Sequence, residues 1–268
     1  MPIYSALQHG WYSYPDLHFQ YHSNKQEIMS WLTWNKKNHN ILRVNSWQKA
    51  VVGCPYVHYR KLHSLKKNPD ASGTIFYPQH GTKKSFVDRN YNALVEELKS
   101  LPSLYQPITV SLVYDDYLND KIRNKYEKHF IVKTPGDPLS DKYILNFYTI
   151  LHAHKYAMGD DVTTASLLAI ESRIPFFLSK TKSFSYRSKI SGKKSWLNSD
   201  SKKKFHSIKI FHDLFGNTPI TSIDKSTIDI VNEELGIGQA SHIIKIYLVI
   251  VLDYINQLFK KRIRIIKS

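Results

Sequence analysis

Two aspartates and three hydroxyl side chains lie close together in the middle of the chain, in the sequence GDDVTTAS at residues 159–166. A short apolar run precedes them and a helical pattern follows, so Thr163 and Thr164 fall where they can cap a helix start. Backbone N–H groups and the helix dipole at such a start favour an anion such as a phosphate. The same pattern is also common in helix starts that serve structure alone.

Polar residues follow other predicted strands as well. His9 comes after a short apolar lead, and the turn at 78–82 (PQHGT) follows the apolar run GTIFY. Loops at the carboxyl ends of parallel strands line the ligand crevice of open α/β sheets. Asp115 and Asp116, which end the strand at 107–114, could hold a divalent metal. Adjacent carboxylates at a helix start more often interact with the helix dipole, so we expect no metal site.

The elements that must position these residues alternate along the chain. Strands are predicted at 73–77, 107–114, 130–134, 155–158 and 175–178, and helices at 87–100, 120–128, from 143 and at 165–172. The strand at 107–114 is a nearly continuous β-branched run, which is typical of a parallel strand buried on both faces. This alternation predicts a doubly wound α/β domain.

At these residues the chain resembles the donor-binding domain of GT-B glycosyltransferases of surface-polysaccharide pathways, including the CDP-glycerol glycerophosphotransferase-like proteins. The resemblance implies a GT-B-like, Rossmann-like fold with a shortened N-terminal part and a helical C-terminal segment. It also implies a set of residues that hold the donor and its diphosphate: Gln79, Gly81, Thr82, Gly136, Asp160, Asp161, Thr163, Thr164, Ser166 and Glu171.

The resemblance extends to acid and base chemistry. In these relatives a His-Gly turn late in the N-terminal domain carries the proposed general base, and His9 is the residue that matches it. His80 or a lysine would stabilise the leaving phosphate. Such a mechanism needs no metal and no cofactor besides the nucleotide-sugar substrate, because helix N-termini offset the charge of the diphosphate.

Three parts of the chain are expected on the same basis. Residues 1–60 would form the shortened acceptor-side part, residues 73–204 the donor-binding domain, and residues 205–268 C-terminal helices with a basic end. The polar segment LHSLKKNPDASG between the first two parts has the composition of a domain linker.

Composition restricts the cellular setting. The formal net charge is +16 and the pI is about 9.6, which indicates a polyanionic neighbour such as nucleic acid or an acidic membrane surface. One cysteine, Cys54, fits a reducing compartment, and the N-terminus lacks the pattern of a signal peptide, so we expect a cytoplasmic protein. Lys245 and Asp253 interrupt the last apolar helix, which leaves it short of the roughly 20 residues of a membrane span.

The leading hypothesis is therefore a glycosyltransferase, or a related polyol-phosphate transferase, of lipopolysaccharide or capsule assembly. Its partners would be a nucleotide sugar, a lipid-linked saccharide acceptor and the anionic surface of the inner membrane, which the basic residues 260–264 could contact. One alternative is a basic nucleic-acid-binding protein that uses residues 182–204, although the pattern of strands and helices favours an enzyme that binds no nucleic acid. Another is an inactive, truncated transferase-like protein.

Overall fold

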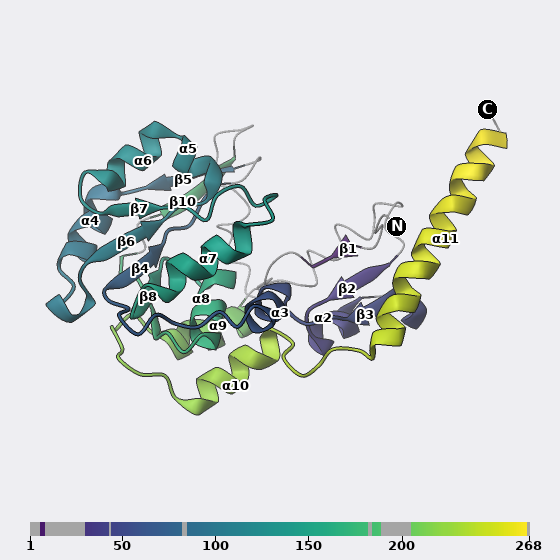
Figure 1. Ribbon diagram of the computed structural model, residues 1–268. Coiled ribbons are helices and arrows are strands. Elements are labelled where there is room, and N and C mark those ends of the chain that lie inside the picture. The colour runs from purple at the N-terminus through teal and green to yellow at the C-terminus, as the bar shows by residue number, and fades with distance from the viewer. Residues whose placement is uncertain are drawn as a thin grey trace. The chain divides into compact units, whose positions relative to one another are not determined.

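Figure 1 shows the computed structural model, which describes residues 6–8, 30–42, 44–81, 85–181, 184–188 and 205–266. The chain divides into two compact units. The smaller unit combines the two ends of the chain, Met1–His58 and Asp229–Ser268, and the larger unit is Tyr59–Ile228. The expected C-terminal part, 205–268, is thus shared between the two units.

The larger unit contains a five-stranded parallel sheet in the order β7-β6-β4-β8-β9. Its strands are β4 (Thr74–Tyr77), β6 (Ile108–Ser111), β7 (Ile131–Lys133), β8 (Tyr156–Gly159) and β9 (Phe176–Leu178). In chain order this sheet runs third, second, first, fourth, fifth, so the direction of winding reverses between β4 and β8. The predicted α/β fold with a parallel sheet flanked by helices is confirmed, and its topology is Rossmann-like.

Helices connect these strands and cover the sheet. They are α4 (Tyr91–Lys99), α5 (Tyr114–Leu118), α6 (Asp120–Glu127), α7 (Tyr143–His152), α8 (Thr164–Glu171) and α9 (Phe205–Phe215), with a 3-10 turn at Ser103–Tyr105. The boundary between the two units falls inside α3 (Pro55–Leu62) and α10 (Lys225–Glu234).

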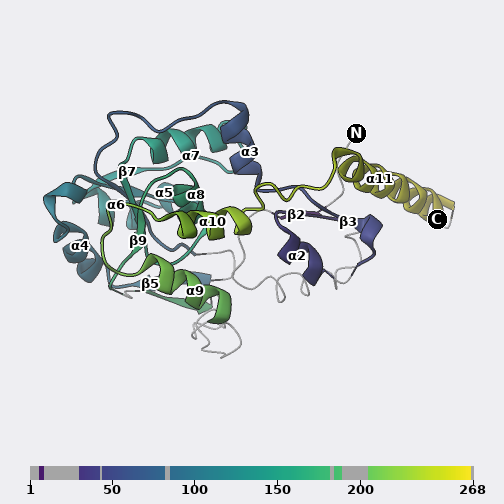
Figure 2. The ribbon, with the colours of Figure 1, turned by 90° about the horizontal axis from the view of Figure 1, so that it is seen from below.

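The main hydrophobic core lies between the sheet and α4. Leu94 and Leu98 of α4 are fully buried against Phe76 of β4 and Met158 of β8. Burying each such side chain contributes about 1.5–3 kcal/mol. On the other face of the sheet Tyr77 stacks on Phe147 of α7, with ring centroids 6.2 Å apart, and α8 lies beside α7 (Figures 1 and 2).

One predicted helix begins later than expected. Residues 87–89 are not helical, because Ser85–Arg89 form β5, which pairs with β10 (Phe184–Ser188) in an antiparallel ribbon. The helix α4 begins only at Tyr91, where the Asn90 side chain accepts a hydrogen bond of 3.1 Å from the backbone N–H of Ala93. The sequence SFVDR contains Phe86 and Val87, residue types that are common in strands, and forms a strand when a partner is present.

The smaller unit is built on a second parallel sheet, in the order β1-β2-β3. Its elements are β1 (Ala6–Leu7), β2 (Trp31–Thr33), α2 (Lys36–Ile41), a 3-10 turn (Ser46–Gln48), β3 (Lys49–Val51) and α11 (Ile243–Ile266). Leu32 and Ala50 of the sheet bury against Val249 of α11. None of the helices in the described part of the chain has the length and apolar character that a membrane crossing requires.

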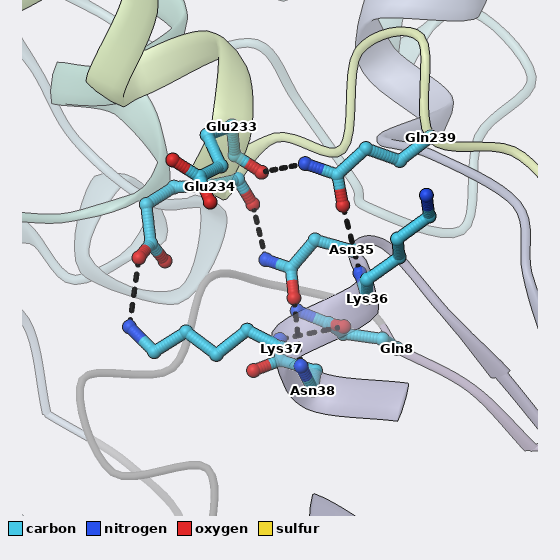
Figure 3. A network of polar contacts seen from close by, with 8 residues as sticks. All are labelled: Gln8, Asn35, Lys36, Lys37, Asn38, Glu233, Glu234 and Gln239. Carbon is cyan, nitrogen blue, oxygen red and sulfur yellow. Dashed lines mark hydrogen bonds and ion pairs between the residues drawn. The ribbon is translucent and has the colours of Figure 1, made fainter. Parts of the chain in front are cut away.

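Polar contacts join the two chain ends within this unit (Figure 3). The Asn35 side-chain amide donates to the backbone oxygen of Glu234 at 2.7 Å, and Lys37 forms an ion pair of 2.8 Å with the Glu234 carboxylate. The Lys36 backbone N–H donates to the Gln239 side chain at 2.8 Å. Residues 234–239 are therefore an integral part of the N-terminal sheet region.

Candidate functional site

The loops that follow β4 and β8 meet at the point where the winding of the sheet reverses. Asp160 directly follows β8, and Gln79 lies two residues beyond β4. The Gln79 backbone N–H donates to Asp160 Oδ2 at 2.8 Å. In open α/β sheets this reversal point is where ligands bind. Two residues expected at the donor site are thus in direct contact there.

A buried ion pair lies at the same point. Arg89, the last residue of β5, places Nη2 2.6 Å from Asp160 Oδ2, and the two side chains are 1% and 0% exposed. Arg89 Nη2 also donates to the Gln79 backbone oxygen at 3.0 Å, and the Phe184 ring lies 5.5 Å from the guanidinium. Burial raises the pKa of the Asp160 carboxyl, and Arg89 offsets part of this effect by favouring the charged form.

Each partner of this pair retains one unsatisfied atom. Arg89 Nη1 and Asp160 Oδ1 are buried and have no hydrogen-bond partner among the described residues. An unsatisfied buried polar group costs about 1–3 kcal/mol, and more when it is charged. Burial also raises the pKa of the nearby Tyr91 and Tyr126 side chains, because their surroundings would solvate a phenolate poorly. At the reversal point, therefore, one nitrogen of Arg89 and one oxygen of Asp160 are buried without hydrogen bonds, in surroundings with little access to water.

The start of α8 lies three residues beyond this pair. Thr163 is the N-cap and forms a capping box with Ser166. The Ser166 hydroxyl accepts from the Thr163 backbone N–H at 2.9 Å, donates to the Thr163 backbone oxygen at 2.6 Å, and is fully buried. The contacts of Ser166 are thus within the cap, whereas Thr163 and Thr164 are half-buried at the helix start.

A histidine and an aspartate form a second polar pair at this edge of the sheet. His212 Nε2 lies 2.9 Å from Asp161 Oδ1, and the side chains are 31% and 37% exposed. His212 belongs to α9, which packs on β9 through Phe215 and Phe176. An imidazole held by a carboxylate in this way can donate or accept a proton. The sequence alone did not indicate His212, because 51 residues separate it from Asp161.

Other residues of the expected donor site lie apart from this cluster. Gly136, with φ of +93°, follows β7 at one end of the sheet order. Glu171 ends α8 and binds Arg60 of α3 through two contacts of 2.5 and 3.0 Å. Because α8 has eight residues at 1.5 Å per residue, Glu171 lies about 10 Å along the helix from Thr164, toward the other edge of the sheet.

Of the two expected catalytic histidines, the structure describes His80 but not His9. His80 is exposed, and its Nδ1 lies 2.7 Å from the backbone oxygen of Gly81, within its own loop. His9 lies outside the described residues, as does Thr82. A strand does precede His9, because β1 ends at Leu7.

Within the described ranges no three His, Cys, Asp or Glu side chains gather closely enough to hold a metal ion. Asp115 and Asp116 lie in the first turn of α5, after the end of β6. There they face the positive end of a helix dipole, which favours carboxylates.

No protein-family model matches this chain, and no curated protein matches it. Function is therefore inferred from the carboxyl edge of the larger sheet. There the reversal point, the start of α8 and the Asp161–His212 pair lie along consecutive residues of one loop, 160–164. Such an edge suits an anionic ligand that carries a phosphate.

Proposed function

We propose that the chain is a transferase of the GT-B kind. It would transfer a sugar or a polyol phosphate from a nucleotide-activated donor to a growing surface polysaccharide or lipopolysaccharide. The observation that carries the proposal is the hydrogen bond between Gln79 and Asp160, which joins the β4 and β8 loops at the reversal point of a doubly wound sheet. The parallel sheet of the smaller unit supports it as well, because GT-B proteins have two domains of this type.

The donor's diphosphate would lie against the first turn of α8. The first N–H groups of a helix have no partner within the helix and point toward such a ligand. Two carboxylates nearby would otherwise repel a diphosphate, but Arg89 offsets the charge of Asp160, and His212 does so for Asp161 when it is protonated. Thr163 and Thr164 would complete the contact through their hydroxyls.

Proton transfer would involve two imidazoles. His9 would accept the proton of the acceptor hydroxyl, as the resemblance implies. His212, oriented by Asp161, would hold a proton next to the leaving phosphate, where an N–H donor stabilises developing negative charge. His80 would contribute from the β4 loop. The acceptor would be lipid-linked, and the positive net charge of the chain would favour its encounter with an anionic membrane surface.

A thermal-shift experiment with the full chain tests the donor site. CMP-, UDP-, GDP-, dTDP- and CDP-linked sugars are compared, because a ligand that binds the folded state raises the melting temperature. One of them should stabilise the wild type, and Thr164→Ala should lose that response. Thr149→Ala, an exposed threonine on α7, is the matched control and should keep it. Equal responses in the two variants would remove the start of α8 from the site.

Turnover tests the role of His212. With a responding donor, His212→Gln should lower the transfer rate about 100-fold or more, and this factor should exceed the factor by which the donor Kd rises. A wild-type rate in this variant would exclude His212 from the proton transfer.

A further inference from the structure

A cavity of about 220 Å³ lies at the edge of the larger sheet opposite to the candidate donor site. Lys67, Lys155 and Arg173 line it and define what we term the basic pocket. Lys155 comes immediately before β8, and Arg173 lies between α8 and β9, so the pocket is at the amino ends of these strands. The loop 160–164 lies at their carboxyl ends, and the two sites are therefore distinct.

The fold brings the three basic residues together. Lys155 and Arg173 meet because β8 and β9 are neighbouring parallel strands that begin at the same edge. Lys67 belongs to the segment 66–72, which runs along the turn between α7 and β8. Two backbone hydrogen bonds hold this segment there, from Asn68 N–H to His152 O at 3.0 Å and from Ser72 N–H to Ala153 O at 3.2 Å.

Arg173 occupies a backbone position that suits glycine. The helix α8 ends in a Schellman motif, in which Arg173 N–H donates to Ile170 O and Ile174 N–H donates to Ala169 O, both at 2.9 Å. The residue at this position takes a left-handed conformation, and Arg173 has φ of +62°. Glycine adopts that conformation without the steric cost that a side chain brings. An arginine at this position therefore has a local conformational cost that a glycine would avoid.

The charges of the basic pocket are not balanced by acids. Among the described residues, none of the three basic side chains forms an ion pair, and no carboxylate lines the cavity. Asp224 is close in sequence to the lining, but its carboxylate caps α10 by accepting bonds from Ser226 and Thr227. Burial and the charge of Lys155 lower the pKa of Lys67. Lys67 and Lys155 therefore repel each other, and none of the three cations pairs with a carboxylate in the described part of the chain.

We propose that the basic pocket binds the phosphate group of a small phosphorylated ligand. Two lysines and an arginine line it, with Lys67 Nζ 3.4 Å from the Lys155 backbone oxygen, and Thr221 and Ser222 add hydroxyls that can donate to phosphate oxygens. The volume equals that of about seven water molecules, which accommodates a phosphate and a few further atoms. This site goes beyond the transferase proposal and does not depend on it.

Titration of the full chain with inorganic phosphate at constant ionic strength tests this proposal. The wild type should show a saturable rise in melting temperature. Arg173→Gly is the sharpest variant, because it removes a cation and relaxes the backbone at once. Without phosphate its melting temperature should equal or exceed that of the wild type, while its affinity for phosphate should fall about tenfold or more. Lys155→Gln provides a second loss of charge that leaves the backbone unchanged.

Lys121→Gln is the matched control, because Lys121 is an exposed lysine on α6. It should bind phosphate as the wild type does. The proposal is overturned if phosphate up to about 10 mM gives no saturable response, or if Arg173→Gly and Lys155→Gln both bind phosphate as tightly as the control.

Discussion

Arg89 at the end of β5 and Asp160 at the end of β8 form an ion pair of 2.6 Å with almost no exposure to solvent. The pair links the antiparallel ribbon β5–β10 to the point where the winding of the parallel sheet reverses. It therefore fixes the loops in which we place the donor site.

Removing one partner should destabilise the larger unit strongly. Arg89→Met leaves the Asp160 carboxyl buried without its counter-charge, which should lower the free energy of unfolding by about 3–5 kcal/mol. Arg123→Met is the control, because its ion pairs on α6 are more exposed and should contribute less than about 1 kcal/mol. Urea unfolding followed by far-UV circular dichroism measures both. Equal losses would show that the buried pair has no special role.

Glu97 should fix residues 179–181, which lead from β9 toward β10 of the same ribbon. Its carboxylate accepts from the Ser179 hydroxyl at 2.6 Å and from the backbone N–H groups of Lys180 and Thr181 at 2.7 and 3.0 Å. Glu97→Gln replaces one acceptor oxygen by an NH₂ donor, so the amides of Lys180 and Thr181 should exchange hydrogen about tenfold faster. The exposed neighbour Glu96 gives the control, Glu96→Gln. Unchanged exchange in Glu97→Gln would contradict the anchoring role.

The sequence predicted the strands well because most of them are apolar runs that end at polar turns. That pattern also placed residues 79 and 160 just after strand ends, and the resemblance to GT-B proteins assigned both to the donor site. It could not indicate Arg89 or His212, whose partners are separated from them by 71 and 51 residues and are reached through the β5–β10 ribbon and α9. Ser166 was expected at the donor site, but its hydroxyl bonds to the backbone of Thr163 within the helix cap. The sequence alone does not distinguish a capping hydroxyl from one that binds a ligand.

Replacing either of two glycines in one turn by alanine should lower the stability of the smaller unit by different amounts. Gly236 and Gly238 have φ of +69° and +74°, so both substitutions strain the backbone. A Cβ on Gly236 would lie 1.7 Å from the backbone oxygen of Trp34, whereas a Cβ on Gly238 meets nothing within 4 Å. Gly236→Ala should cost about 3 kcal/mol or more and Gly238→Ala about 1 kcal/mol.

Unfolding of the two variants in denaturant can be measured by tryptophan fluorescence, because Trp31, Trp34 and Trp47 all belong to the smaller unit. Equal unfolding midpoints in denaturant for the two glycine variants would contradict the close approach to Trp34.

Acid should weaken the larger unit through His152. Burial lowers the pKa of this imidazole from 6.5 to about 4, and the charge of Arg60 acts in the same direction. The unfolded chain takes up the proton at higher pH than the folded chain. The contribution of neutral His152 to stability is therefore complete above pH 6.5 and is lost as the pH falls toward 4.

The expected loss from His152 is on the order of 2 kcal/mol between pH 7 and pH 4. His152→Phe removes this titration and keeps a ring beside Tyr148, whose centroid lies 5.2 Å away. Its free energy of unfolding, measured by circular dichroism in urea, should fall less steeply over this range than that of the wild type. Parallel pH profiles would contradict the assignment.

Chemical-shift mapping with the full chain, labelled with nitrogen-15, tests the donor site most directly. The nucleotide-linked sugar that gives the largest thermal shift is added, and the backbone amides of Gln79 and of residues 160–164 are followed. These amides should show the largest saturable changes, and the amides around Lys155 and Arg173 should respond instead to inorganic phosphate. A donor site at the carboxyl edge of the larger sheet is contradicted if no donor changes the amides of residues 79 and 160–164, or if the largest changes occur elsewhere in the chain.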